Sequence, residues 1–186
     1  VLNRNFKALV TTGPTREYLD PVRYISNESS GKQGYEVALA LKKLGIKTKL
    51  ISGPSNLISS NNLKIKKIVS AKDMMNEVKK SLPVDIAVCA AAISDFKPKV
   101  KSKKKIKKTD SNFDKIDLEK NPDILEYLSK NNKLRPKIVV GFSAETEDLI
   151  KNSKYKIRDK YCDLIVANDV SKKDFGFNSE YNKVFI

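Results

Sequence analysis

Small residues gather just before one helical pattern, in the string SSGKQG of residues 29–34. Free N–H groups at the start of a helix, beside residues small enough to let an anion approach, form a phosphate site. The sequence has neither the GxxxxGK[ST] spacing of a Walker A loop nor the GxGxxG spacing of dinucleotide-binding proteins. A strand–helix connection without a ligand explains the string about equally well, so by itself it is weak evidence for phosphate binding.

Lysines form the second group of residues with relevant chemistry. The string KPKVKSKKKIKK, residues 97–108, follows Asp95. On a flap, these cations would offset the negative charge that develops in phosphoryl or nucleotidyl transfer. Composition alone favours a solvated loop whose charges repel. Lys156 and Lys160 are four residues apart and therefore share a face of a predicted helix. Either an anion bound between them or simple exposure to solvent would explain two like charges on one face.

The sequence contains no histidine, which excludes a Ser-His-Asp triad, a Cys-His dyad and a His-ligated zinc within this chain. Its two cysteines, Cys89 and Cys162, lie far apart in apolar segments and lack metal-ligand spacing. We expect both to be reduced and mostly buried. Charge on a ligand or a transition state must therefore be stabilised by Lys, Arg, Asp, Glu, polar side chains and backbone N–H groups.

The formal net charge is +15, and the isoelectric point is about 9.7. A basic face for nucleic acid and a site for polyanionic small molecules are the two interpretations. Lysines are spread along the whole chain, and the aromatic residues show no RNA-binding signature. The sequence therefore favours small polyanionic ligands over a nucleic-acid partner.

The chain of 186 residues suits one domain with a hydrophobic core. No apolar run is long enough to span a bilayer and no cleavable leader opens the sequence, so we expect a cytoplasmic protein without a membrane partner. The first residue is Val1, which suggests a processed chain or a piece of a longer polypeptide.

Apolar periodicity predicts alternating strands and helices. The run at residues 84–93 is almost continuously apolar, as in a strand buried on both faces of a parallel sheet. The alternation predicts a Rossmann-like, doubly wound α/β fold with a mainly parallel sheet. The expected strands are 7–12, 47–52, 63–69, 84–93, 137–143 and 164–168, and the expected helices are 34–44, 71–82, 122–129 and 146–160.

One stretch interrupts the alternation. Residues 97–120 are predicted to form a partly mobile β-hairpin flap outside the main sheet, with 105–107 opposing 115–119 and a turn at 109–112. In open α/β sheets, ligands bind beyond the carboxyl ends of the strands. Polar segments rich in small residues follow four of the expected strands, and we expect the site there: 11–34, 90–96, 141–146 and 167–179.

Taken together, these segments resemble one family. The strings are TTGPTREYLDPVRYISNESSGKQG, SGP, CAAAISDF, KIKK, NPDIL, GFSAET and ANDV. Their order and approximate spacing are similar to those of bacterial phosphopantothenoylcysteine synthetase, the ligase domain of the bifunctional coenzyme A biosynthesis protein. The resemblance extends from about residue 7 to residue 182, and the GPTRE–LDPVRYISN–SSGK pattern is highly specific.

The resemblance implies an enzyme that joins 4′-phosphopantothenate to L-cysteine with CTP and Mg²⁺. The carboxylate attacks the α-phosphate to give an acyl-cytidylate and pyrophosphate, and the cysteine amine then displaces CMP. It also implies a homodimer. In the family, a flavin-dependent decarboxylase is fused on the N-terminal side, which this sequence does not include, and the ligase domain normally continues beyond the position of Ile186. Residues 1–186 would then be a single ligase domain.

Residue roles follow from the same resemblance. Asn27 matches the asparagine that turns over the acyl-cytidylate, and Lys105 the lysine that forms it, although Lys103 and Lys104 leave the register of this lysine open. Glu28 replaces a neutral or basic residue that is common in the family. The implied nucleotide-binding residues are Cys89, Ala90, Ala91, Asp95, Lys105, Pro122, Asp123, Ile124, Leu125, Phe142, Lys156 and Lys160, and the implied phosphate or substrate loop is Gly13, Ser29, Ser30 and Gly31.

Two other functions remain as alternatives. A nicotinamide-dependent oxidoreductase would share the sheet, but the sequence lacks GxGxxG and a Tyr–Lys pair at short helical spacing. A basic nucleic-acid-binding domain would rest on the lysine-rich stretch alone. The resemblance favours the ligase, without deciding between CTP and ATP or assigning ligands to Mg²⁺.

Overall fold

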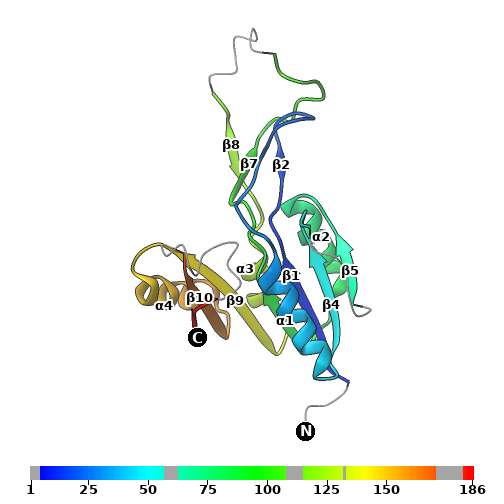
Figure 1. Ribbon diagram of the computed structural model, residues 1–186, viewed down its shortest axis with the longest axis vertical. Helices are drawn as coiled ribbons and strands as arrows, with labels where there is room; N and C mark the ends of the chain where they lie inside the picture. Colours follow the sequence, from blue (N-terminus) through cyan, green and yellow to red (C-terminus); the bar gives the residue numbers. More distant parts are fainter. Residues whose placement is uncertain (1–4, 57–62, 108–114, 132, 171–181) are drawn as a thin grey trace.

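The computed structural model describes residues 5–56, 63–107, 115–131, 133–170 and 182–186. Within them, a seven-stranded sheet has the order β11-β10-β9-β6-β1-β4-β5 (Figure 1). Neighbouring strands are parallel except for β10 and β11. The predicted Rossmann-like, mainly parallel sheet is therefore confirmed. Its strands are β1 (Lys7–Thr12), β4 (Lys47–Ser52), β5 (Lys64–Lys67), β6 (Ile86–Cys89), β9 (Ile138–Glu145), β10 (Leu164–Asp169) and β11 (Val184–Phe185).

Helices cover both faces of the sheet. Successive side chains of a strand point to opposite faces, so Leu9 and Val10 of β1 belong to two different core clusters. The cluster with Val10 packs under α1 (Lys32–Lys43). The cluster with Leu9 packs under the other three helices, which are α2 (Ala71–Ser81), α3 (Ile124–Ser129) and α4 (Leu149–Lys160).

Local signals fix the ends of these helices. Ser70 and Asp73 form a capping box at the start of α2, where each side chain accepts a hydrogen bond from the other residue's backbone N–H. After α1, Gly45 has a φ of 81°, a left-handed conformation that favours glycine. The predicted stop at Gly45 is thereby confirmed.

An arm projects from one end of the sheet (Figure 1). It contains two antiparallel strand pairs: β2 (Glu17–Tyr18) with β3 (Tyr24–Ile25), and β7 (Phe96–Pro98) with β8 (Leu118–Lys120). The predicted hairpin flap is present, but its predicted pairing is wrong. Residues 105–107 form no strand, because residues 102–106 bond instead to the turn between β2 and β3.

Several predicted boundaries also shift. The apolar run at 84–93 forms a strand only over β6, because its pairing with β9 ends at Cys89. Beyond that residue, Ala90 and Ala92 still bond to Thr11 and Gly13, with an isolated bridge between Pro14 and Ala92. The last predicted helix begins at Leu149, because β9 stays paired with β10 as far as Glu145. The predicted turn at 109–112 lies outside the described residues. Among the residues that are described, no helix is long and apolar enough to cross a membrane.

Candidate functional site

A cavity of about 490 Å³ lies at the carboxyl end of β6, between β9, α3 and α4. It is at the sheet edge where ligands are expected in this fold class. Four separate segments supply its walls: the end of β6 with the loop after it, the residues leading from β8 into α3, the strand β9, and one face of α4. The predicted nucleotide-binding residues that line it are Cys89, Ala91, Asp95, Pro122, Asp123, Ile124, Leu125, Phe142, Lys156 and Lys160.

The two lysines of α4 reach the cavity together, as their four-residue spacing predicted. Lys160 Nζ lies 2.7 Å from Asp159 Oδ2, 3.2 Å from Asp123 Oδ2 and 3.8 Å from Glu126 Oε2. The hydrogen bond to Asp159, with the further bond to Asp123, raises the pKa of Lys160 despite its partial burial. This lysine is therefore a permanent cation held among carboxylates, which explains its closeness to a second lysine without a bound anion.

Lys156 is held differently. Its Nζ donates a 2.9 Å hydrogen bond to the backbone carbonyl oxygen of Phe142, which also lines the cavity. A carbonyl oxygen positions the ammonium group without neutralising its charge. Lys156 is thus the better placed of the two lysines to meet an anionic ligand.

The start of α3 faces the same cavity. Asp123 caps this helix by accepting a 2.9 Å hydrogen bond from the backbone N–H of Glu126. Because Asp123 also pairs with Lys160, it joins α3 to α4 across the cavity wall. The stretch Pro122–Leu125 therefore belongs to the site through its local fold.

Both cysteines are free thiols, as predicted. Burial raises the pKa of the Cys89 thiol to about 12, with a contribution from the nearby Asp123 carboxylate. Burial also raises the pKa of Cys162. Cys89 is consequently a protonated wall residue of the cavity and not a nucleophile at neutral pH.

Asn27 lies beside the cavity without being part of its wall. Its Nδ2 donates a 3.0 Å hydrogen bond to the carbonyl oxygen of Ile93, which does line the cavity. The loops around it are joined by further bonds, from Ser26 Oγ to the Thr15 carbonyl oxygen and from the Ser94 N–H to Thr15 Oγ1. The structure therefore holds Asn27 at the rim, where its exposed amide is accessible to a ligand.

The predicted phosphate loop lies at the next strand end, between β1 and α1. Thr12 Oγ1 donates a 2.6 Å hydrogen bond to the carbonyl oxygen of Gly31, whose φ is 75°. Gly13 also has a positive φ, of 71°. The hydroxyls of Ser29 and Ser30 accept bonds from the N–H groups of Gly31 and Lys32. These four predicted loop residues are not part of the cavity wall, and their role remains a prediction.

Two of the predicted nucleotide-binding residues do not line the cavity. The N–H of Ala90 bonds to the carbonyl oxygen of Thr11, so this residue joins β6 to β1. Lys105 is exposed, and the segment that carries it is bonded to the turn between β2 and β3 in the arm. The structure thus separates Lys105 from the cavity of its own chain.

Sequence reasoning missed several wall residues, of which Asn121 is the most informative. Its Nδ2 donates to the Ser94 carbonyl oxygen at 2.8 Å, and its N–H donates to the Asp95 carbonyl oxygen at 2.8 Å. Asn121 therefore ties the segment before α3 to the loop after β6. Its place directly before Pro122 in the NPDIL string was the available signal. The other missed wall residues are Ile93, Ser94, Phe96, Lys120 and Glu126.

Comparison with known proteins decides the family. Residues 4–186 match the family described as DNA/pantothenate metabolism flavoprotein C-terminal domain. The chain belongs to this family. Its solved relatives include the C-terminal domain of a coenzyme A biosynthesis bifunctional protein CoaBC, which is 35% identical with a TM-score of 0.77. That match covers 90% of this chain and 80% of the relative.

Curated members of the family are larger proteins. The coenzyme A biosynthesis bifunctional protein CoaBC of Vibrio vulnificus is 42% identical over 95% of this chain and 44% of its own length. The corresponding protein of Bacillus subtilis is 41% identical over 96% of this chain and 44% of its own length. The chain thus spans less than half the length of these bifunctional relatives.

Proposed function

We propose that the chain is a ligase that joins 4′-phosphopantothenate to L-cysteine, with CTP consumed to CMP and pyrophosphate, as a step of coenzyme A synthesis. One observation carries the proposal. All the residues that the family resemblance assigns to the nucleotide, except Ala90 and Lys105, line one cavity although they come from four distant segments. Membership of the family, whose curated relatives are bifunctional coenzyme A biosynthesis proteins, favours the ligase over an oxidoreductase or a nucleic-acid-binding domain.

In the first step, a carboxylate oxygen of phosphopantothenate attacks the α-phosphorus of CTP. A new P–O bond forms to give the acyl-cytidylate, and the bond to pyrophosphate breaks. Negative charge builds on the phosphate oxygens, so fixed cations nearby lower the barrier. Lys156, oriented by the Phe142 carbonyl oxygen, supplies one such cation, and Lys105 is assigned another.

In the second step, the amine of cysteine attacks the acyl carbon, the C–O bond to CMP breaks, and the amine loses a proton. Negative charge now develops on the acyl oxygen and is stabilised by a hydrogen-bond donor. Asn27 is suited to this role, because its amide has two N–H bonds and one of them is directed to the Ile93 carbonyl oxygen at the cavity rim.

Mg²⁺ fits the cavity as a companion of the nucleotide. Among the described residues, no group of three or more acidic or cysteine side chains forms a metal cage. Mg²⁺ is commonly held by one or two carboxylates together with substrate phosphates. Asp95, an exposed wall residue, would supply the carboxylate, since Asp123 already caps α3 and pairs with Lys160. When bound, the ion neutralises phosphate charge.

The test is pyrophosphate release by the chain with Mg²⁺, phosphopantothenate, cysteine and either CTP or ATP. We expect release with CTP, and failure with both nucleotides refutes the proposal. Without cysteine, Asn27→Asp should accumulate the acyl-cytidylate in mass spectra, because only the second step needs the lost donor. Loss of one such donor typically slows a step by about 10²–10³-fold.

Lys105→Gln should form almost no acyl-cytidylate under the same conditions. If Lys105→Gln instead accumulates the intermediate, or Asn27→Asp yields none, the two role assignments are wrong. Lys104→Gln and Lys103→Gln are the matched controls, since all three lysines are exposed neighbours on one segment. Loss of the intermediate in one of these controls alone would move the role to that lysine.

The protein is also proposed to act as a homodimer, natively fused to a flavin-dependent decarboxylase domain. The arm supports the dimer, because several of its apolar side chains are exposed, among them Val22, Tyr24, Val100, Ile116 and Leu118. We expect a dimer in sedimentation at concentrations of about tens of micromolar, typical of weak association, and a monomer alone contradicts the proposal.

Mixing the Asn27→Asp and Lys105→Gln variants reveals which cavity the arm serves. If the arm serves the partner's cavity, a mixed dimer contains one site with both native residues, and activity returns. If the arm serves its own cavity, every site lacks one of the two residues, and the mixture stays inactive.

A further inference from the structure

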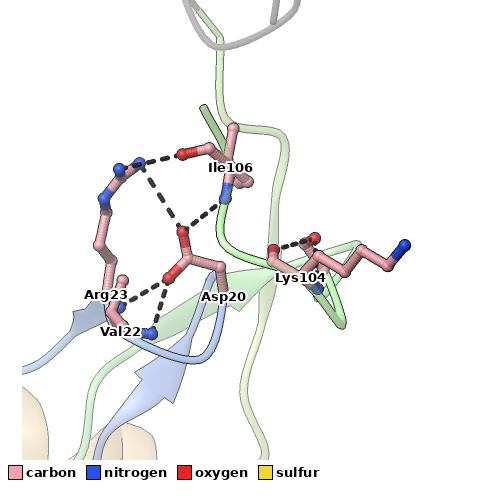
Figure 2. Close-up of polar contacts among 6 residues, drawn as sticks. Asp20, Val22, Arg23, Lys104 and Ile106 are labelled. Atoms are coloured by element: carbon pink, nitrogen blue, oxygen red, sulfur yellow. Dashed lines mark hydrogen bonds and ion pairs between the residues drawn. The ribbon is translucent and has the colours of Figure 1, made fainter. Parts of the chain in front are cut away.

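The turn between β2 and β3 binds the lysine-rich segment of the arm through one buried carboxylate (Figure 2). Asp20 is 0% exposed. Its Oδ1 accepts hydrogen bonds from the N–H groups of Val22 and Arg23, at 2.8 and 2.9 Å. Its Oδ2 accepts a 3.2 Å bond from the N–H of Ile106, which is 86 positions away in the sequence. The carboxylate thus stabilises its own turn and also holds a distant segment.

Arg23 also binds Ile106, through the carbonyl oxygen of that residue. Its NH2 group donates a 3.1 Å hydrogen bond to the carbonyl oxygen of Ile106, and its NH1 group lies 3.7 Å from Asp20 Oδ2. Both backbone polar groups of Ile106 are therefore bound, one by Asp20 and one by Arg23 (Figure 2). Two such bonds fix both the position and the orientation of this residue.

The segment is also held at its other end. The N–H of Ser102 donates a 2.8 Å bond to the carbonyl oxygen of Leu19. The Ser102 hydroxyl donates to the Lys104 carbonyl oxygen at 2.6 Å and accepts from the Lys104 N–H at 3.2 Å. Lys105 therefore lies in a short loop bound to the β2–β3 turn on both sides. Its side chain is exposed, while the backbone that carries it is fixed.

We infer that Asp20 is a positioning residue that, with Arg23, sets the place of Lys105 for the first half-reaction. This inference rests on the proposed ligase function. The turn that Asp20 organises continues through β3 to Asn27, so the same carboxylate connects the backbone segments of both residues assigned to the reaction. Asp20 acts through Ile106 and does not itself contact the substrate.

The charge of Asp20 suits this role. Burial alone would raise the pKa of its carboxyl group, but the N–H groups of Val22, Ile106 and Arg23 and the charge of Arg23 outweigh burial and keep the pKa below its usual range. At neutral pH the group is an ionised acceptor. In Asp20→Asn, an amide keeps the size but loses the charge, and it has one acceptor oxygen for the N–H groups that two oxygens now serve.

The first experiment measures structure without any substrate. Amide hydrogen exchange of peptides covering residues 102–107 is compared between wild type, Asp20→Asn and Asp85→Asn. Asp85 is the matched control, because it also accepts a backbone N–H and pairs with a cation, but at the start of the sheet. We expect faster exchange at Ile106 in Asp20→Asn only. Unchanged exchange overturns the inference, whether or not the chain is a ligase.

The second experiment measures acyl-cytidylate formation without cysteine. A displacement of about 1 Å can cost about 10²-fold in rate, and we expect a loss of that order in Asp20→Asn. If Asp20 acts through Lys105, the double variant with Lys105→Gln is no slower than Lys105→Gln alone. Multiplied losses in the double variant, or faster exchange with a normal rate, overturn the inference. Failure of wild type with every nucleotide refutes the ligase instead.

Arg23→Lys guards against a folding defect in Asp20→Asn. Arg23 is partly exposed, and lysine keeps its charge but cannot hold Asp20 and the Ile106 carbonyl oxygen with one planar fork. We expect faster exchange at residues 102–107 and a smaller loss in the same half-reaction. Native exchange together with a native rate in Arg23→Lys contradicts the inference.

Discussion

Replacing Gly34 with alanine tests how closely α1 approaches β1. Gly34 is buried in the first turn of α1, and a Cβ atom there would overlap Thr12 Oγ1 and lie 2.6 Å from Thr12 Cβ and 3.1 Å from the Thr11 carbonyl oxygen. Thr12 cannot rotate away freely, because its hydroxyl donates the 2.6 Å bond that holds Gly31. The substitution therefore forces either the strand or the loop before α1 to move.

Opposing effects set the expected change in the free energy of unfolding. Overpacking a core position costs about 1–3 kcal/mol, and losing the Thr12–Gly31 hydrogen bond adds about 1 kcal/mol. Alanine is the better helix former by about 1 kcal/mol at an interior helix position. We therefore expect Gly34→Ala to lower the free energy of unfolding by about 1–3 kcal/mol. The close approach of α1 to β1, and not helix propensity, decides the sign of this change.

Urea unfolding followed by circular dichroism measures this change, since a shift in the midpoint at constant slope reports stability. Glu36→Ala is the control, because Glu36 is exposed on the same helix and a surface change there should stay within about 0.5 kcal/mol. If Gly34→Ala is as stable as wild type or more stable, helix propensity dominates and the inferred contact between Gly34 and Thr12 is wrong.

Three further predictions concern charge. In the proposed reaction, Lys160→Gln should raise the KM for CTP, because the carboxylates around Lys160 lose their cation and repel the phosphates. Initial rates test this, with the exposed Lys151→Gln as the control. Cys89 should resist iodoacetamide in the folded chain at pH 8, since a pKa of about 12 leaves only about one thiol in 10⁴ ionised, and rapid labelling before unfolding contradicts this. The Lys7 N–H and Lys137 lower the pKa of Asp85 in the folded chain. Asp85 therefore stabilises the fold at pH values above its ordinary pKa of about 3.9. This contribution is lost as the pH falls through the lower pKa of the folded state. Asp85→Asn should accordingly flatten the acid side of the stability curve, and an unchanged curve is the contrary result.

The parallel sheet was predictable because its strands are short apolar runs at regular intervals. The bounds of β1 and β4 agree with those expected from the sequence, since polar or glycine residues end both runs. The strand at 84–93 was predicted too long for a physical reason. Ala90 and Ala91 are apolar enough to continue a strand, but composition does not reveal that the pairing with β9 ends at Cys89, beyond which Ala91 lines the cavity.

The arm could not be predicted in detail, because its pairing depends on tertiary contacts. Alternating apolar residues at 115–119 suggested a strand opposite 105–107, yet Ile106 is bound by Asp20 from the other hairpin. In the sequence, the string DPVR only indicates a turn. Likewise, the place of Lys156 and Lys160 on one face followed from their spacing. The carboxylates around Lys160 did not, because they come from α4 itself, from α3 and from the N-cap of α3.

The charges of the cavity bear on the role proposed for the arm. Lys120, Lys156 and Lys160 line the cavity, and so do Asp95, Asp123 and Glu126, so the wall carries as many acidic as basic side chains. The formal excess of +15 is therefore not concentrated there. A triphosphate that enters this wall brings several negative charges that the wall alone does not balance. In the proposed reaction, the balancing charge must come from cations outside this wall, and the proposed sources are Mg²⁺ and further lysines. The segment at residues 97–107 is the richest source of lysines among the described residues. Lys103, Lys104 and Lys105 are exposed while the backbone around them is bonded to the β2–β3 turn, which suits them to the proposed role.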